Sequence, residues 1–223
     1  EREQLKVHKL KRVYPKVDAV LTSSYFLRDE LLWPKAKVIA LGCDHVTDYG
    51  QPSTQRTASD HAPLRVGTLM RLGSGEALYK GLDEYLAIVS HFTDRPGFDF
   101  SIMGRGEESD RLWWEERGVH CHLNATDEER STFLSELDVF ISPSKWEGFN
   151  LPLVEAHASG TVGLAFDVGA HPETTPYVLA NIADANFLLE EWQRDSALLQ
   201  LASERCYTYS RKKFPWEATA IEL

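Results

Sequence analysis

Short apolar runs alternate with amphipathic stretches along most of this chain of 223 residues. The runs are rich in Val, Ile, Leu and Phe, are too short for helices, and are separated by Gly, Pro, Ser and Asp. They predict strands at residues 18–24, 37–41, 64–70, 98–104, 119–123, 138–144 and 161–167.

The stretches between these runs have helical spacing, as in residues 80–92, where positions 82, 85, 86 and 89 are apolar. Thr126, with Glu129 three residues later, forms the signature of a capping box. Helices are predicted at 24–32, 80–92, 107–117, 126–137 and 151–160, and through a helical region after residue 167. This alternation predicts an α/β fold with a Rossmann-like, doubly wound, mostly parallel sheet. Such sheets bind ligands at the carboxyl ends of their strands.

A polar stretch rich in Ser, Thr, Gly and Pro interrupts the alternation at residues 47–63. This composition is typical of a linker. We therefore expect a boundary here, with residues 1–62 belonging to one unit and its linker and residues 63–223 to a second domain.

Charge and cysteine content exclude several functions. Lys plus Arg is 24 and Asp plus Glu is 34, so the net charge is 24 − 34 = −10. A chain this acidic is a poor partner for nucleic acid, whose binding depends on neutralising phosphates. The three cysteines are widely spaced, which favours reduced thiols and a cytoplasmic location. No apolar run reaches the length of a membrane span, and the charged opening residues do not resemble a signal peptide.

The stretch 142–160, "SPSKWEGFNLPLVEAHASG", carries the candidate chemistry. Asn150 is a good N-cap, so the amides near Phe149, Asn150 and Leu151 should lie at a helix N-terminus, which attracts phosphate. Glu147 should lie on the preceding loop and Glu155 about one turn into the helix, both facing one crevice. The alternative is a capped helix with two solvated glutamates, since acidic residues also suit a helix N-terminus.

The same stretch closely resembles the signature of the family-four retaining glycosyltransferases, whose fold is called GT-B. That signature has a Glu-Gly-Phe turn and a second glutamate eight residues after the first. Weaker matches follow in the family's order: "DAVLTSS" with "ALGCDH", "SIMGRGEESDRL", "HLNATDEERSTFLSELDVFISPS", "DVGAHPE" and "KKFPWEATA". The resemblance implies a nucleotide-sugar donor domain in residues 63–223, preceded by the tail of the acceptor-side N-terminal domain and a linker in residues 1–62.

The resemblance also implies roles for single residues. Glu147 would contact the transferred sugar, and Glu155 would hold the ribose hydroxyls of the nucleotide. The turn formed by Gly148, Phe149, Asn150 and Leu151 would contact the diphosphate and sugar through its backbone amides.

A basic pair in the family neutralises the diphosphate. Lys80, before Gly81, matches the family's lysine, whereas Thr68 stands where the family's arginine usually lies, and Arg71 is the nearest substitute. Fixed cations suit a leaving diphosphate, which gains charge as the glycosidic bond breaks. Lys80 and Arg71 could instead be solvated surface cations. Gly104 follows a strand and would let a ligand approach the backbone.

The resemblance implies a transferase of carbohydrate biosynthesis that needs no metal or other cofactor. It would move a sugar from a nucleoside-diphosphate sugar to a glycan, lipid-linked or other acceptor. We expect this chain to bind the donor but to be inactive without the missing N-terminal domain, which could bring peripheral membrane association. The alternatives are a non-catalytic nucleotide-sugar-binding or interaction module of the same fold, a GT-B phosphorylase, or a sugar-nucleotide epimerase. His120 and His122 share a strand face, but no third ligand is patterned near them, so a metal site is not expected there.

Overall fold

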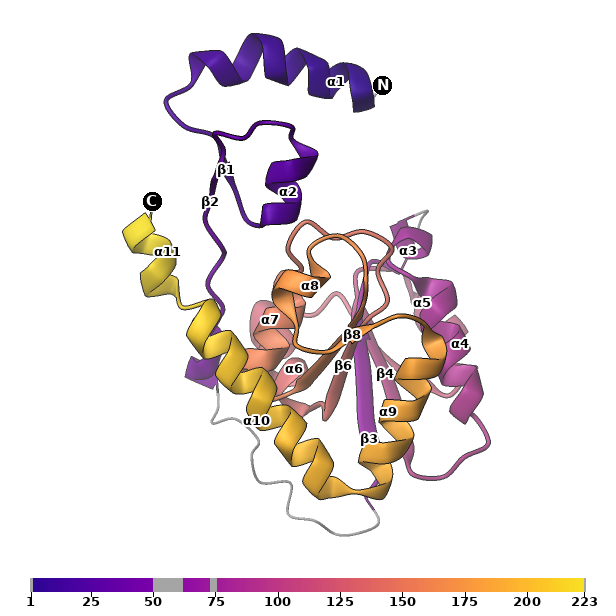
Figure 1. Ribbon diagram of the computed structural model, residues 1–223. Coiled ribbons are helices and arrows are strands. Elements are labelled where there is room, and N and C mark those ends of the chain that lie inside the picture. The colour runs from indigo at the N-terminus through magenta and orange to yellow at the C-terminus, as the bar shows by residue number, and fades with distance from the viewer. Residues whose placement is uncertain (1, 50–61, 73–75, 223) are drawn as a thin grey trace.

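The computed structural model describes residues 2–49, 62–72 and 76–222 (Figure 1). Most of the predicted linker, residues 47–63, lies outside the described residues, so the domain boundary stays a prediction.

Within the described residues, one sheet of six parallel strands has the order β5-β4-β3-β6-β7-β8. Val66, Ile102, Phe140 and Leu164 lie on four neighbouring strands of it, which confirms the predicted α/β fold. The chain order reverses between β3 and β6, the position at which such sheets open a crevice. The strands are β3 (Leu64–Leu69), β4 (Phe98–Gly104), β5 (Val119–Leu123), β6 (Val139–Ser142), β7 (Val162–Phe166) and β8 (Val178–Leu179).

Helices cover both faces of this sheet (Figure 1). One apolar core joins α4, α5 and α9 to the strands, with Trp114 and Tyr85 completely buried in it. A second core lies under α6 and α7, around Phe133, Leu134 and Leu153. The helices after β3 are α3 (Glu76–Tyr79), α4 (Leu82–Phe92), α5 (Glu108–Glu115), α6 (Asp127–Glu136), α7 (Leu151–Ala158), α8 (His171–Thr174), α9 (Ile182–Arg194), α10 (Ser196–Lys213) and α11 (Trp216–Glu222).

The segment before the sheet ends in contact with α7, because Cys43 and Val46 are buried in one apolar cluster with Val154 and Ala158 of that helix. It contains α1 (Arg2–His8), β1 (Leu21–Thr22), α2 (Tyr25–Glu30), β2 (Lys37–Val38) and a 3-10 helix (Asp44–Tyr49). β1 and β2 pair in parallel, and both are shorter than the apolar runs predicted. The N-terminus of α2 is bound by Glu173, whose carboxylate accepts from the backbone N–H groups of Tyr25 (2.9 Å) and Phe26 (2.7 Å). These bonds hold α2 above the loops at the carboxyl ends of the strands (Figure 1).

The last helix, α11, returns to this preceding segment (Figure 1). The backbone N–H of Trp216 donates to Asp44 Oδ1 (2.8 Å), and Thr219 Oγ1 donates to the carbonyl of Ala40 (2.8 Å). Trp216 also packs on Gly42, where a Cβ atom would come within 2.4 Å of the indole ring. The stretch around residues 40–44 and the start of α11 therefore lie against each other. Of the helices that the structure describes, none combines the length and apolar character that a membrane span needs.

Candidate functional site

A pocket of about 380 Å³ opens at the carboxyl ends of β3, β4 and β6, beside the N-terminus of α7. This is the position that the strand order predicts for a ligand. The pocket brings together the predicted residues Arg71, Lys80, Gly104, Glu147, Asn150 and Leu151. Three other predicted residues, Gly148, Phe149 and Glu155, do not line it.

Lys80 and Glu147 form the centre of the pocket. Lys80 Nζ lies 2.5 Å from Glu147 Oε1, and Ser144 Oγ donates to the same oxygen at 2.9 Å. The backbone fixes both residues: Gly81, which follows Lys80, has φ +82° and lies so close to β6 that a Cβ would meet the carbonyl of Pro143 at 1.9 Å. Only glycine fits there without strain. Two residues that are 67 apart in sequence are thereby held in direct contact.

Asn150 shapes the start of α7. It has φ +66°, and its Oδ1 accepts from the backbone N–H of Leu153 at 3.3 Å, which confirms the predicted N-cap. Its Nδ2 donates to Ser142 Oγ (2.6 Å) and to His171 Nε2 (2.8 Å). The backbone N–H of Leu151 has no acceptor among the described residues, so it remains available to an anion at the helix N-terminus.

His171 is a residue that the sequence did not assign to the site. Its Nδ1 lies 2.8 Å from the carbonyl oxygen of Phe166, which can only accept, so Nδ1 carries the proton and Nε2 is free to accept from Asn150. Burial lowers the pKa of His171, against the opposing effects of the Phe166 carbonyl and Glu147, while Lys80 lowers it further. The imidazole is therefore held neutral. Its place before Pro172 and Glu173 in the "GAHPE" turn was the only signal in the sequence.

The pocket is rich in cations. Arg71, Lys80, Arg105 and Arg130 all line it, against the carboxylates of Asp127 and Glu147 among its described residues. Arg105 and Arg130 were not predicted: Arg105 directly follows β4, whereas Arg130 lies near the start of α6. Gly104 has a packing reason to be glycine, because a Cβ there would lie 1.8 Å from the carbonyl of Met70. Its small size serves the approach of β3 to β4 rather than that of a ligand alone.

Gly148 and Phe149 lie behind the pocket. The carbonyl of Gly148 accepts from Ser24 Oγ at 2.6 Å, which ties the turn to the start of α2. Phe149 is buried in a third apolar cluster against Phe214. Any contact that these two residues make with a ligand must come from their backbone.

Glu155 differs most from expectation. Its side chain exposes no surface, so only Glu147 of the two glutamates faces the crevice. Oε1 lies 3.2 Å from His45 Nε2 and Oε2 lies 3.4 Å from Arg130 Nη1. These are ion-pair distances, yet neither oxygen receives a hydrogen bond of good geometry from the described residues. Glu155 is thus a buried carboxylate with unused acceptor capacity, joined to the pocket through Arg130.

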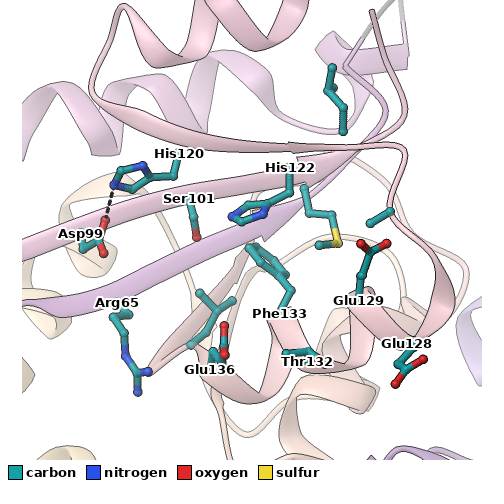
Figure 2. A pocket seen from close by; sticks show the side chains of 14 residues that line it. Arg65, Asp99, Ser101, His120, His122, Glu128, Glu129, Thr132, Phe133 and Glu136 are labelled. Carbon is teal, nitrogen blue, oxygen red and sulfur yellow. Dashed lines mark ion pairs between the residues drawn. The ribbon is translucent and has the colours of Figure 1, made fainter. Parts of the chain in front are cut away.

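A larger groove, of about 700 Å³, lies elsewhere, between α6 and the sheet face of β3, β4 and β5 (Figure 2). His120 pairs with Asp99 at 3.3 Å, whereas the ring of His122 packs on Phe133. The described residues contain no cluster of three or more His, Cys, Asp or Glu that could hold a metal ion. Because this groove runs along the sheet face and holds none of the signature residues, we do not assign the chemistry to it.

Comparison with known proteins now identifies the family. Residues 66–194, more than half of the chain, match the protein family described as "Glycosyl transferases group 1". The chain belongs to the group 1 glycosyltransferases. A 55-residue stretch is 47% identical to the MMP alpha-(1->4)-mannosyltransferase of Mycolicibacterium hassiacum, covering 25% of this chain and 13% of that protein.

Solved structures of glycosyltransferases share the fold. The sucrose-phosphate synthase of Thermosynechococcus elongatus matches with a TM-score of 0.75 and 19% identity, over 100% of this chain and 60% of that one. Anabaena Alr3699/HepE, solved in complex with UDP and glucose, matches with a TM-score of 0.76 and 14% identity, over 99% and 64% respectively. The group 1 chain thus spans less than two thirds of each of these proteins, and its fold matches that of GT-B glycosyltransferases.

Proposed function

We propose that this chain carries the donor-binding part of a retaining glycosyltransferase. The full protein would transfer a sugar from a nucleoside-diphosphate sugar to a glycan, lipid-linked or other acceptor. The observation that carries the proposal is the meeting of Lys80, Glu147 and the N-terminus of α7 in one pocket at the carboxyl edge of the sheet. A scaffold or interaction module would have no use for this arrangement.

The diphosphate is the first ligand group to place. The α7 N-terminus offers the Leu151 N–H and the positive end of the helix dipole, and four cationic side chains surround the same space. As the bond between sugar and diphosphate breaks, negative charge grows on the leaving group, and fixed cations lower the energy of that state. Lys80 has three N–H donors, so it can bind a phosphate oxygen and keep its contact with Glu147. We therefore expect no requirement for a metal ion.

The two glutamates take different parts of the donor. Glu147 lies in the pocket and is proposed to contact the transferred sugar. Glu155 is buried, and hydroxyl groups are the partners that would satisfy its free acceptor capacity, so we assign it to the ribose. Because its side chain exposes no surface, ribose must displace part of the Arg130 side chain, which lines the pocket, to reach it.

Calorimetry with UDP, GDP and ADP, in buffer containing EDTA, tests this proposal. We expect at least one of them to bind with a Kd of about 0.1–1 mM, which corresponds to about 4–5.5 kcal/mol. The affinity is expected to be modest because this chain spans less than two thirds of the neighbouring structures, and residues beyond that span could add contacts to a bound donor. We expect no sugar transfer by this chain alone. Failure of all three nucleotides to bind at 5-fold higher concentration would contradict the assignment, and so would strict dependence on added magnesium or manganese.

A further inference from the structure

One of the two basic side chains beside Glu155 comes from the segment that precedes the parallel sheet in the sequence. His45, in the 3-10 helix that precedes this domain, places Nε2 3.2 Å from Glu155 Oε1. The imidazole is partly exposed, at 40% of its side-chain surface, whereas the carboxylate is completely buried. The preceding segment therefore reaches into the donor domain at the residue proposed to hold ribose.

The hydrogen bond on the other side of the ring fixes the tautomer of His45. The indole Nε1–H of Trp216 donates to His45 Nδ1 at 2.8 Å. An indole nitrogen can only donate, so Nδ1 carries no proton in this contact. The neutral ring then carries its proton on Nε2, which faces Glu155. Trp216 thus donates to one side of the His45 ring, and the other side lies within ion-pair distance of Glu155.

These three side chains lie where the stretch around residues 40–44 meets the start of α11. Asp44, next to His45, accepts from the backbone N–H of Trp216, and the backbone N–H of Cys43 donates to the carbonyl of Phe214 (2.9 Å). Four hydrogen bonds from three consecutive residues, two to Trp216 and two to the carbonyl of Phe214, therefore fix His45 relative to the start of α11 and the residues just before it. A ring held this firmly can orient a carboxylate.

We propose that His45 is a positioning residue for Glu155, and that Trp216 sets the tautomer in which it acts. The proposal rests on the proposed function, because it assigns His45 to the binding of ribose through Glu155. A carboxylate has about four lone-pair sites, so contacts from His45 and Arg130 leave acceptor sites for two ribose hydroxyls. His45 restricts rotation of the buried carboxylate before ribose binds. Less conformational entropy is therefore lost when ribose binds.

Three probes separate this role from a general effect on the pocket. They are the ribonucleoside diphosphate that binds the unaltered chain most tightly, its 2′,3′-dideoxy counterpart, and inorganic diphosphate. We expect His45→Ala to lower affinity for the ribonucleotide about tenfold, near the upper limit for the cost of ordering one side chain on binding, because the Glu155 carboxylate would lose the neighbour that restricts its rotation. Affinity for the two probes without ribose hydroxyls should stay within about twofold, because neither would engage Glu155.

Conservative variants test the geometry. His45→Gln keeps an N–H donor near the position of Nε2 and should restore most of the ribonucleotide affinity. Trp216→Phe keeps the packing on Gly42 but removes the indole donor, and should produce a smaller loss, about threefold, again only for the ribonucleotide. His91→Ala is the matched control, since His91 also pairs with a glutamate, Glu190, at 3.3 Å and similar exposure, but lies outside the pocket.

The outcomes are distinct. Unchanged ribonucleotide affinity in His45→Ala, or equal losses for all three probes, would overturn the role of His45 while leaving the proposed function intact. If the unaltered chain bound no nucleoside diphosphate, the proposed function and this inference would fail together. Thermal unfolding midpoints, measured for every variant, show whether a loss of affinity reflects a loss of fold.

Discussion

Lys80 and Glu147 show how single backbone positions create the site. Their contact depends on two glycines at which the chain comes too close for a side chain. Gly81 lies against Pro143, and Gly169, with φ +56°, lies so close to the backbone of Glu147 that a Cβ would come within 2.3 Å. The backbone N–H of Ala170 also donates to the carbonyl of Glu147 at 2.9 Å. The contact between Lys80 and Glu147 is therefore fixed by main-chain packing, independently of any ligand.

Separate substitutions should divide the roles of this pair. Lys80→Ala should lower affinity for nucleoside diphosphate at least tenfold, because a charged hydrogen bond to phosphate contributes about 1.5–3 kcal/mol. Glu147→Gln should change it less than threefold, because that residue is assigned to the sugar. Lys145→Ala is the matched control. Lys145 lies in the loop that carries Glu147, but it pairs with Glu84 at 3.1 Å outside the pocket. Equal losses in Lys80→Ala and Lys145→Ala, measured by calorimetry, would contradict the assignment.

Glu155→Ala belongs to the same comparison. If Glu155 holds ribose, this substitution should weaken nucleoside diphosphate and nucleotide sugar alike, by about 1.5–3 kcal/mol. It also removes a buried carboxylate that no hydrogen bond satisfies among the described residues, so the fold should not lose stability to the same extent. Calorimetry together with urea unfolding separates the two quantities. If Glu155→Ala bound both ligands with unchanged affinity, Glu155 would have a structural role and would not bind ribose.

His171 should make stability depend on pH. Its pKa is lowered in the fold by burial, so the unfolded chain, with an ordinary pKa of about 6.5, takes up the proton first as the pH falls. The stabilisation is therefore complete above about pH 6.5 and decreases below it, by up to about 1.4 kcal/mol per pH unit. His171→Gln keeps an acceptor for Asn150 but does not titrate. Its melting temperature should fall less between pH 7 and pH 5 than that of the unaltered chain; equal falls would show that His171 does not contribute.

At the scale of elements, the local sequence predicted the helix caps, whereas contacts between residues far apart in the chain left no pattern in it. Thr126 and Glu129 form the predicted capping box of α6, and Asn150 caps α7 as predicted, because caps depend on residues within one turn. β8 was missed because two residues cannot show a periodic pattern. The contact of His171 with Asn150 and that of His45 with Glu155 join distant parts of the chain, so no local pattern could reveal them.

The capping box of α6 offers a measurable contribution. Thr126→Ala should lower the free energy of unfolding by about 1 kcal/mol, because its hydroxyl accepts from the Glu129 N–H at 3.2 Å and Glu129 bonds back to Thr126. Thr132→Ala, an exposed change of the same chemistry in the same helix, should have little effect. Urea unfolding measures both. A similar loss from the two substitutions would indicate that the box does not stabilise the helix.

At the scale of the whole molecule, residues 40–44 and the start of α11 are packed and hydrogen-bonded to each other. Gly42 contacts Trp216, the backbone N–H of Trp216 donates to the side chain of Asp44, and the backbone N–H of Cys43 donates to the carbonyl of Phe214. Motion of the preceding segment must therefore carry α11 with it. A displacement of either stretch would therefore also change the contact between His45 and Glu155.

Gly42→Ala should separate α11 from residues 40–44, because its Cβ would overlap the indole of Trp216. Hydrogen exchange of the amides in α11 should become faster, while exchange in the central strands stays unchanged. In a Trp216→Ala background the same substitution should have little further effect, since the overlapping ring is gone. Additive effects of the two changes would show that the clash is not the cause.

The strand order also has a consequence for synthesis on the ribosome. β3 is made first but lies in the middle of the sheet, and its second neighbour, β6, follows much later: Val66 pairs with Val139, a separation of 139 − 66 = 73 residues. At about 5–20 residues per second, translation needs about 4–15 s to cover that distance. During this time β3, β4 and β5 can pair only with one another, and one edge of β3 has no strand beside it. A released chain that ends after residue 137 should therefore aggregate or recruit chaperones more readily than one that ends after residue 194, which contains β6 and β7 to close that edge.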